Sequence, residues 1–278
     1  MKTGDINAWQ GPALRTLFAL KYILGEKKAN ALLSGLNARL VKSFERQLAK
    51  NGPGSVRPVA TERDLSLSEF RDKYQSKNIP VVLKGAASNW ECVRKWDLDF
   101  LKKSYGDDAV SVLYPKGLSL TDDNQDLEES TLGEFIESIQ NGGKKYLRFH
   151  PFLMEHPELL EDLDLNWIRK IQTRGVLRPE YQIFVGPQGS HTPVHCAMPC
   201  NLFVQVHGTK RWMLFEPNDF PLLKPNLSGL SYYETDVDPL NVDTEEYPLF
   251  PYAHAQEVIL EPGDIFWNPP YMWDCVTN

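Results

Sequence analysis

The residues best suited to chemistry lie in two segments near the end of the chain. The first is SHTPVHCAMPCNLFVQVHGTKRWMLFEPND (190–219), and the second is LEPGDIFWNPPYMWDCVTN (260–278). Both segments contain imidazole, carboxylate or thiol side chains, which are groups that bind divalent metal ions. Lys210 follows a Gly turn at the start of a predicted strand, and a lysine directed into a protein interior requires an anionic partner. A small dicarboxylate would meet that requirement.

Strands must position these side chains. Beyond residue 180, short apolar segments alternate with Gly, Pro and Asn turns, which predicts a barrel or a sandwich. Alternate side chains of a strand share a face, so His191, His195 and position 197 should point the same way. The acidic segment 234–246 interrupts the strands and is expected to be a solvated loop. The predicted strands lie in YQIFVG, HTPVHCA, NLFVQVHG, KRWMLFEP, QEVILEPGD, IFWNPP and MWDCVTN.

The earlier part of the chain is more helical. Leucines and Phe44 recur every three or four residues between 33 and 48, which predicts an amphipathic helix, and a similar pattern covers 14–23. NGPGS (51–55) is typical of a linker. We therefore divide the chain into a helical segment with its linker (1–55) and a second domain (56–278). The helices are expected to pack on this domain or to form a homodimer.

Composition excludes several classes of protein. The 278 residues include 37 acidic and 30 basic ones, a net charge of −7, which argues against a general DNA or RNA binder. Four cysteines without a CxxC pair favour reduced thiols and a cytoplasmic location. Apolar stretches are much shorter than the ~20 residues of a membrane span. The partner expected from composition is therefore neither DNA nor a membrane.

The two segments resemble the metal-binding strands of the JmjC and cupin-like Fe(II)/2-oxoglutarate-dependent oxygenases. In that family a strand reads T-P-x-H-x-D, followed by Asn, Q-x-x-G-x-K-R and L-F-x-P, and a later P-G-D strand ends on a metal-binding His. PVVLKGAASNW (80–90) and KWDLDFLKKSYGD (95–107) resemble the family's entry strand and helix. The resemblance covers 57–278. It implies a mainly β, α+β fold: a double-stranded β-helix (jelly-roll barrel) with flanking helices.

The resemblance also implies the chemistry. Such oxygenases hold Fe(II) with two histidines and one carboxylate and leave positions open for 2-oxoglutarate and O2. His195 matches the first histidine, whereas Ala197 stands at the family's Asp and Asp274 at its second His. His195 and Asp274 are therefore the expected metal ligands and catalytic residues. The implied activity is hydroxylation of a protein or small-molecule substrate.

The residues that bind the cosubstrate in this family are matched better in this sequence than the metal ligands are. By resemblance, Lys210 and Thr192 would hold the distal carboxylate of 2-oxoglutarate, and Asn201 stands where the family places another polar contact. Tyr146 or Tyr181 is expected to add a phenol from a neighbouring strand.

The altered ligands leave several interpretations open. The protein is a degenerate oxygenase, an inactive binding module whose changes are natural or engineered, or a halogenase with a halide at the position vacated by Ala197. A thiolate-rich site built from Cys196, Cys200 and Cys275 is a less favoured alternative, since strand alternation turns the first and last of these away from the ligands. Family members usually continue with another strand after Asp274, so the chain is either truncated or a closed-off variant.

Overall fold

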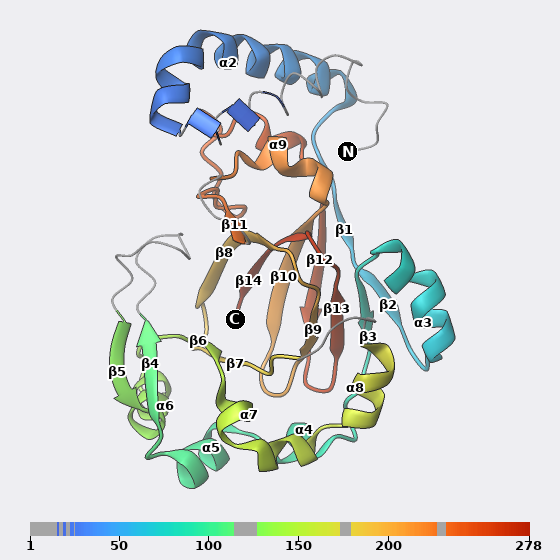
Figure 1. The fold of residues 1–278 in the computed structure, drawn as a ribbon, viewed down its shortest axis with the longest axis vertical. Helices are drawn as coiled ribbons and strands as arrows, with labels where there is room; N and C mark the ends of the chain where they lie inside the picture. Colours follow the sequence, from blue (N-terminus) through green and yellow to red (C-terminus); the bar gives the residue numbers. More distant parts are fainter. Residues whose placement is uncertain are drawn as a thin grey trace.

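The computed structural model describes residues 16, 19, 20, 23, 24, 26–113, 127–172, 179–226 and 232–278. Two facing sheets form its centre (Figure 1). In the larger sheet the strand order is β1 (Val56–Pro58), β12 (Ala255–Leu260), β10 (Lys210–Phe215), β14 (Trp273–Thr277), β8 (His191–Ala197) and β11 (Tyr232–Glu234). In the smaller sheet the order is β2 (Ala60–Glu62), β3 (Val81–Leu83), β13 (Ile265–Asn268) and β9 (Asn201–Val204).

The space between the two sheets is apolar and closely packed. Both sheets contribute to it: Trp212, Leu214 and Val276 come from the larger sheet, and Val82 and Phe266 come from the smaller one. We call this space the sheet interior. Two mainly antiparallel sheets around one interior, with helices outside them, confirm the predicted jelly-roll fold of the α+β class.

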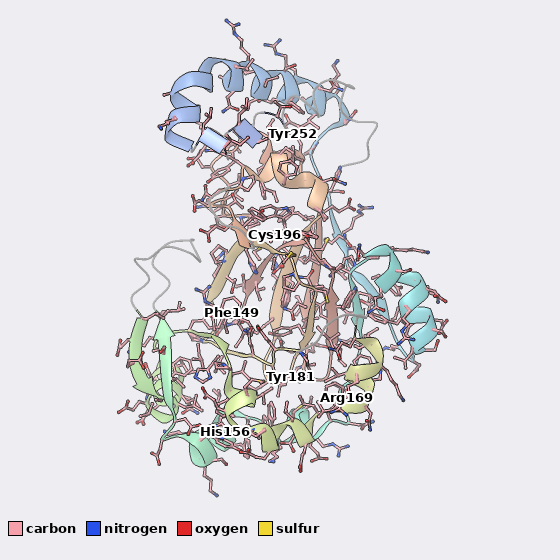
Figure 2. All side chains as sticks on the ribbon, in the orientation of Figure 1. Phe149, His156, Arg169, Tyr181, Cys196 and Tyr252 are labelled. Carbon is pink, nitrogen blue, oxygen red and sulfur yellow. The ribbon has the colours of Figure 1, made fainter. Side chains whose placement is uncertain are left out.

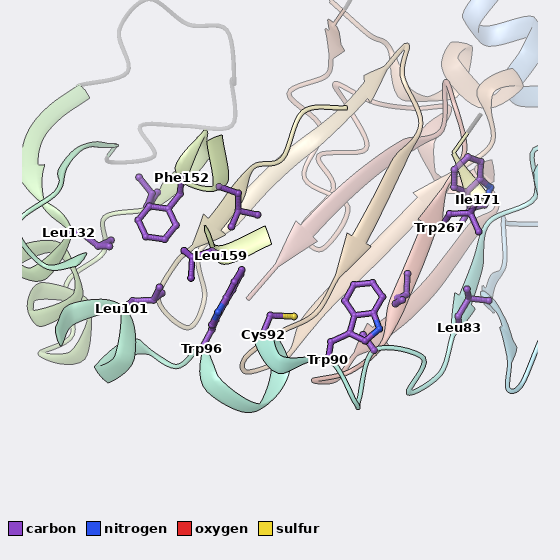
Figure 3. Close-up of a cluster of buried hydrophobic side chains, with 14 of the residues drawn as sticks. Leu83, Trp90, Cys92, Trp96, Leu101, Leu132, Phe152, Leu159, Ile171 and Trp267 are labelled. Atoms are coloured by element: carbon purple, nitrogen blue, oxygen red, sulfur yellow. The ribbon is translucent and has the colours of Figure 1, made fainter. Parts of the chain in front are cut away.

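A helical layer covers the outer face of the smaller sheet. Trp267 of β13 packs into the same buried cluster as Trp96, Leu101 and Phe152 from these helices (Figure 3). The elements of this layer are α3 (Leu67–Lys73), α4 (Glu91–Lys95), α5 (Leu98–Tyr105), α6 (Leu132–Gln140), α7 (Phe152–Glu155) and α8 (Leu165–Ile171), with two two-stranded sheets, one of β4 (Ala109–Leu113) and β5 (Leu127–Thr131) and one of β6 (Leu147–His150) and β7 (Ile183–Val185).

Local capping motifs explain where several of these helices begin. Ser66 and Glu69 form a reciprocal capping box at α3, and Thr131 and Glu134 form another at α6. Asp97 caps α5 through a 2.7 Å bond from the Phe100 backbone N–H.

The N-terminal helix α2 (Glu26–Leu48) packs on the far side of the larger sheet, above α9 (Phe220–Leu223) (Figure 1). Leu40, Phe44 and Leu48 of α2 enter a cluster that also holds residues of β8, β10 and β14. Leu36, on the same predicted stripe, is 53% exposed. Most of the predicted helix at 14–23 lies outside the described residues. The homodimer remains a prediction.

The predicted linker is packed rather than extended away from the body. The Gly54 backbone N–H donates to Pro251 O at 2.8 Å, and the Ser55 backbone N–H donates to His254 Nδ1 at 3.1 Å. A Cβ on Gly54 would meet the Ala253 carbonyl oxygen at 1.8 Å, so only glycine fits this approach. The segment therefore joins α2 closely to the rest of the protein.

The sequence predicts that the acidic segment 234–246 is a solvated loop, but the structure shows that its first residues are buried. Its first residue ends strand β11, and Glu234, Thr235 and Val237 are buried. Asp243, Glu245 and Glu246 are exposed as expected. The prediction fails at the start of the segment because pairing with β8 draws these residues into the sheet. No helix within the described residues has the length and apolar character of a membrane span.

Candidate functional site

Three neighbouring strands of the larger sheet place ionisable residues in one row. His195 of β8 pairs with Asp274 of β14 on one side and with Glu234 of β11 on the other. Directly paired residues share a face of a sheet. Val276, two residues after Asp274, packs in the sheet interior, and so does Leu214, which pairs with Asp274 from β10. The row therefore faces the sheet interior.

A β-bulge in β8 adds Thr192 to this face. Asp274 pairs with His195 but Val276 pairs with Thr192, so β8 has one extra residue between the two pairs. Thr192 is buried on the interior side. His191 pairs with Thr277 on the outer face, so the expectation that it shares a face with His195 is wrong. The bulge reverses the alternation on which that expectation depended.

The His195 ring is oriented by its own strand. Its Nδ1 lies 2.8 Å from the Pro193 carbonyl oxygen, which can only accept, so Nδ1 carries the donated proton. In the neutral ring this leaves a lone pair on Nε2. Nε2 lies 3.7 Å from Asp274 Oδ1. Fixing of one ring nitrogen by a backbone carbonyl, with the other directed at a metal, is the usual arrangement of metal-binding histidines.

The Asp274 carboxylate is deeply buried, with 4% of the residue exposed. Its Oδ2 accepts a 2.8 Å hydrogen bond from Asn268 Nδ2, whereas Oδ1 has no hydrogen-bond donor among the described residues. Burial raises the pKa of this carboxyl above its ordinary value, opposed by His195 and by the Asn268 bond. The contact between Nε2 and Oδ1 therefore needs a proton on one of the two atoms or a cation that both atoms bind.

The two atoms suit a divalent cation. Metal–ligand bonds to His nitrogen and carboxylate oxygen are about 2.1 Å long, so one ion can reach two donors that are 3.7 Å apart. The family's third ligand is missing, because Ala197 has no donor atom. In the part of the chain that the structure describes, no three His, Cys, Asp or Glu side chains converge on one point. The residues fit a metal ion held by two protein donors.

The cysteines do not supply the third donor. Cys196 and Cys275 pack in the cluster between the larger sheet and α2, and the strand register puts them on the face opposite His195 and Asp274. Figure 2 labels Cys196. Burial raises the pKa of both thiols to about 12, which keeps them protonated. The thiolate-rich site is therefore contradicted for these two residues.

Lys210 lies in the same interior, at the other end of the strands. A turn positions it: Gln205 Nε2 donates to the carbonyl oxygens of His207 and Gly208 at 2.7 and 3.1 Å, and Gly208 has φ +64°. This turn explains the Q-x-x-G-x-K-R pattern. Lys210 is 7% exposed, and its Nζ donates to the Tyr146 hydroxyl at 3.4 Å.

An amide is the hydrogen-bond acceptor of this lysine. Lys210 Nζ donates to Asn278 Oδ1, and Asn278 Nδ2 donates to Ser190 Oγ. A Cβ on Gly186 would meet Ser190, Asn278 and Tyr146 atoms at 2.5 to 2.7 Å, so these groups are tightly packed. A carboxylate has the same planar shape as this amide and would bind the ammonium more strongly.

The remaining predicted residues are dispersed. Asn201 is exposed at the start of β9, where it pairs with Asn268, the residue that bonds Asp274. Tyr181 packs with the helical layer (Figure 2). Of the two predicted phenols, only Tyr146 contacts Lys210 in the described structure.

Aromatic rings fill the space between the row of His195, Asp274 and Glu234 and Lys210. Trp212 contacts Phe203 and Phe266 edge-on, with both centroid distances 5.1 Å. Core packing, rather than a stacking surface for a base, is therefore the role of these rings. The Trp212 indole N–H is buried and lacks an acceptor among the described residues. Asp274 Oδ1 and Asn268 Oδ1 are also buried without a hydrogen-bond partner among the described residues.

Asp264 of the P-G-D motif is structural. Its carboxylate accepts hydrogen bonds from the Gly85 and Glu261 backbone N–H groups at 3.0 and 2.9 Å, and it pairs with Lys84 at 2.9 Å. These contacts join the turn before β13 to the end of β3. The motif therefore fixes the smaller sheet against which the site is built.

Comparison with known proteins agrees with this geometry. Residues 67–278 match the family model described as "Cupin-like domain". The chain is 28% identical over 211 residues to "Lysine-specific demethylase 8" of Xenopus tropicalis, covering 75% of this chain and 47% of that protein. It is 28% identical over 222 residues to "Jumonji C domain-containing protein 5" of Drosophila melanogaster (77% and 55%). It is 37% identical over 104 residues to human "HSPB1-associated protein 1" (36% and 21%). The chain thus spans about half the length of the first two relatives.

Proposed function

The chain belongs to the cupin-like domain family, and on this premise we propose that it is a JmjC-like Fe(II)/2-oxoglutarate-dependent oxygenase with a reduced metal site. The observation that carries the proposal is the contact between His195 and Asp274. With a neutral imidazole and an ionised carboxyl, their facing atoms Nε2 and Oδ1 are both acceptors, they are 3.7 Å apart, and Oδ1 has no donor within the described structure. A divalent cation satisfies both atoms.

Each residue then has a distinct role. His195 and Asp274 would hold the metal ion, and Asn268 orients the Asp274 carboxylate through its 2.8 Å hydrogen bond. Lys210, supported by Tyr146, would bind the distal carboxylate of 2-oxoglutarate in place of the Asn278 amide. Bound Fe(II) supplies the activation of O2 for hydroxylation. The aromatic interior excludes water from the space between these groups.

The names of the relatives are the evidence that bears on the class of substrate. Two of the relatives are named as a lysine-specific demethylase and as a JmjC domain protein, which supports a protein side chain as the substrate of this chain. A small molecule is the alternative. The fold does not choose between them.

Calorimetry with Mn(II) as an air-stable substitute for Fe(II) tests the proposal. We expect 2-oxoglutarate to bind the protein only when Mn(II) is present, because the metal and Lys210 hold opposite ends of the same molecule. The His195→Ala variant should bind neither Mn(II) nor 2-oxoglutarate. The Lys210→Met variant should bind 2-oxoglutarate more weakly and Mn(II) as tightly as the wild type does. Absence of any Mn(II)-dependent binding by the folded wild-type protein would refute the proposal.

The second candidate function is a catalytically inactive binding module. Its support is the amide of Asn278, which already fills the anion position of Lys210, together with the loss of the family's carboxylate at Ala197. A module of this kind should bind Mn(II) no better than His195→Ala does. The same calorimetric series therefore separates the two functions.

A further inference from the structure

Glu234 is a buried carboxylate beside the metal-binding pair that no family pattern predicts. It ends the edge strand β11, only 5% of the residue is exposed, and it pairs directly with His195. Resting on the function proposed above, we propose that Glu234 supplies the second carboxylate ligand of the metal ion, replacing the one lost at Ala197.

The register brings Glu234 as close to His195 as a sheet allows. The Glu234 carbonyl oxygen accepts from the Asn226 N–H, so it points away from β8, while the next residue, Thr235, donates its N–H to Val194 O at 3.0 Å. Glu234 and His195 therefore form a non-hydrogen-bonded pair, the type in which Cα atoms are only about 4.5 Å apart and side chains are closest.

The row also has the right order for a shared ion. His195 lies between Asp274 and Glu234, because β8 lies between β14 and β11. Asp274 Oδ1, within a residue more than nine-tenths buried, faces His195 without a hydrogen-bond donor among the described residues. An imidazole flanked by two carboxylates on one face offers one neutral nitrogen and two anionic oxygens as donors. Such a set of donors suits hard divalent ions.

Binding requires the Glu234 side chain to exchange its present interaction for the metal ion. The three carboxylate and imidazole groups do not converge in the described structure. Glu234 has three rotatable side-chain bonds, and a Cβ–Cβ separation of about 4.5–5.5 Å to a directly opposite residue lets its carboxylate reach the His195 ring without displacement of β11. Ala197 has no side chain beyond Cβ, so it leaves room for this carboxylate on the interior face.

The test is Mn(II) affinity, measured by the loss of the free Mn(II) signal in electron paramagnetic resonance. Glu234→Gln keeps the size of the side chain and removes its charge, and should raise the Mn(II) dissociation constant at least roughly tenfold. Glu245→Gln is the matched control, because Glu245 is an exposed carboxylate of the same segment. It should leave the dissociation constant unchanged.

A second variant separates ligation from a merely structural role. Ala197→Asp restores a carboxylate at the family position, so in this background Glu234→Gln should no longer weaken Mn(II) binding. A loss of affinity that persists in the double variant would overturn the inference, as would an unchanged affinity in Glu234→Gln alone. If the wild-type protein itself binds no Mn(II), the proposed function fails first, and this inference fails with it.

Discussion

His195 and Asp274 are directly paired across β8 and β14, and their facing atoms Nε2 and Oδ1 lie 3.7 Å apart. The Pro193 carbonyl holds the imidazole from one side, and Asn268 holds the carboxylate from the other. Burying the Asp274 carboxylate costs stability unless a positive charge compensates for it. We propose that a bound cation supplies this charge.

The Asp274→Asn substitution should therefore have opposite effects on the stability of the metal-free protein and on its affinity for Mn(II). Because burial raises the pKa of the Asp274 carboxyl, its charged form is costly in the folded protein. An Asn amide at the position of Oδ1 can donate to His195 Nε2, so we expect the metal-free variant to be more stable by on the order of 1 kcal/mol. Mn(II) affinity should fall at least roughly tenfold. Urea unfolding and Mn(II) titration measure the two effects; lower stability with unchanged affinity would contradict the account.

Asn278 should compete with 2-oxoglutarate for Lys210. Its Oδ1 accepts from Lys210 Nζ, so Asn278→Ala removes the internal acceptor and should strengthen Mn(II)-dependent 2-oxoglutarate binding roughly tenfold. Asn278→Asp places a carboxylate on the same ammonium and should weaken that binding. Calorimetry on the two variants measures these opposite changes in the affinity for 2-oxoglutarate. Equal changes in the same direction would show that Asn278 acts only through packing.

Cys92 should be inert to alkylation at pH 8.5. Burial in the helical layer raises the pKa of its thiol to about 11. Because the folded state favours the protonated thiol, this contribution to stability is fully present below the unfolded-chain pKa of about 8.5 and is lost as pH rises through about 11. Iodoacetamide with peptide mapping should label Cys92 only in denaturant. The free energy of unfolding should fall less steeply above pH 9 in Cys92→Ala than in the wild type.

Helix α2 should contribute to the stability of the whole protein. Phe44 is 1% exposed and packs against the cluster behind β8 and β14, so Phe44→Ala should cost about 3–5 kcal/mol in the free energy of unfolding. Leu36→Ala, at a position 53% exposed, should change it by less than about 0.5 kcal/mol. Denaturant unfolding compares the two variants. Equal effects would mean that α2 is not part of the cooperative unit.

Local signals made much of the fold predictable. The capping boxes at Ser66 and Thr131 set the starts of α3 and α6, and the apolar segments after residue 180 became β7 to β10 and β12 to β14. Each of these features depends on residues a few positions apart. Lys210 was assigned to an interior anion position because a Gly turn and a strand start are likewise visible locally.

The features that the sequence did not predict depend on partner strands. The bulge that turns Thr192 and His195 to one face exists only in the register of β8 with β14. Strand β11 has three residues next to an acidic run, with too little alternation to be recognised, so Glu234 was assigned to a solvated loop. The contact of Asn278 with Lys210 joins residues 68 positions apart, and nothing near either residue indicates it.

The most direct test of the central claim is an anaerobic Fe(II) titration in the presence of 2-oxoglutarate, followed by the visible charge-transfer absorption of the chelated iron. We expect a saturable band near one equivalent of iron in the wild-type protein, and no band in the folded His195→Ala variant. Such a result would show that His195 and Asp274 assemble an iron–cosubstrate site. Absence of the band at millimolar Fe(II) in the folded wild-type protein would contradict the account and leave the binding module as the function of this chain.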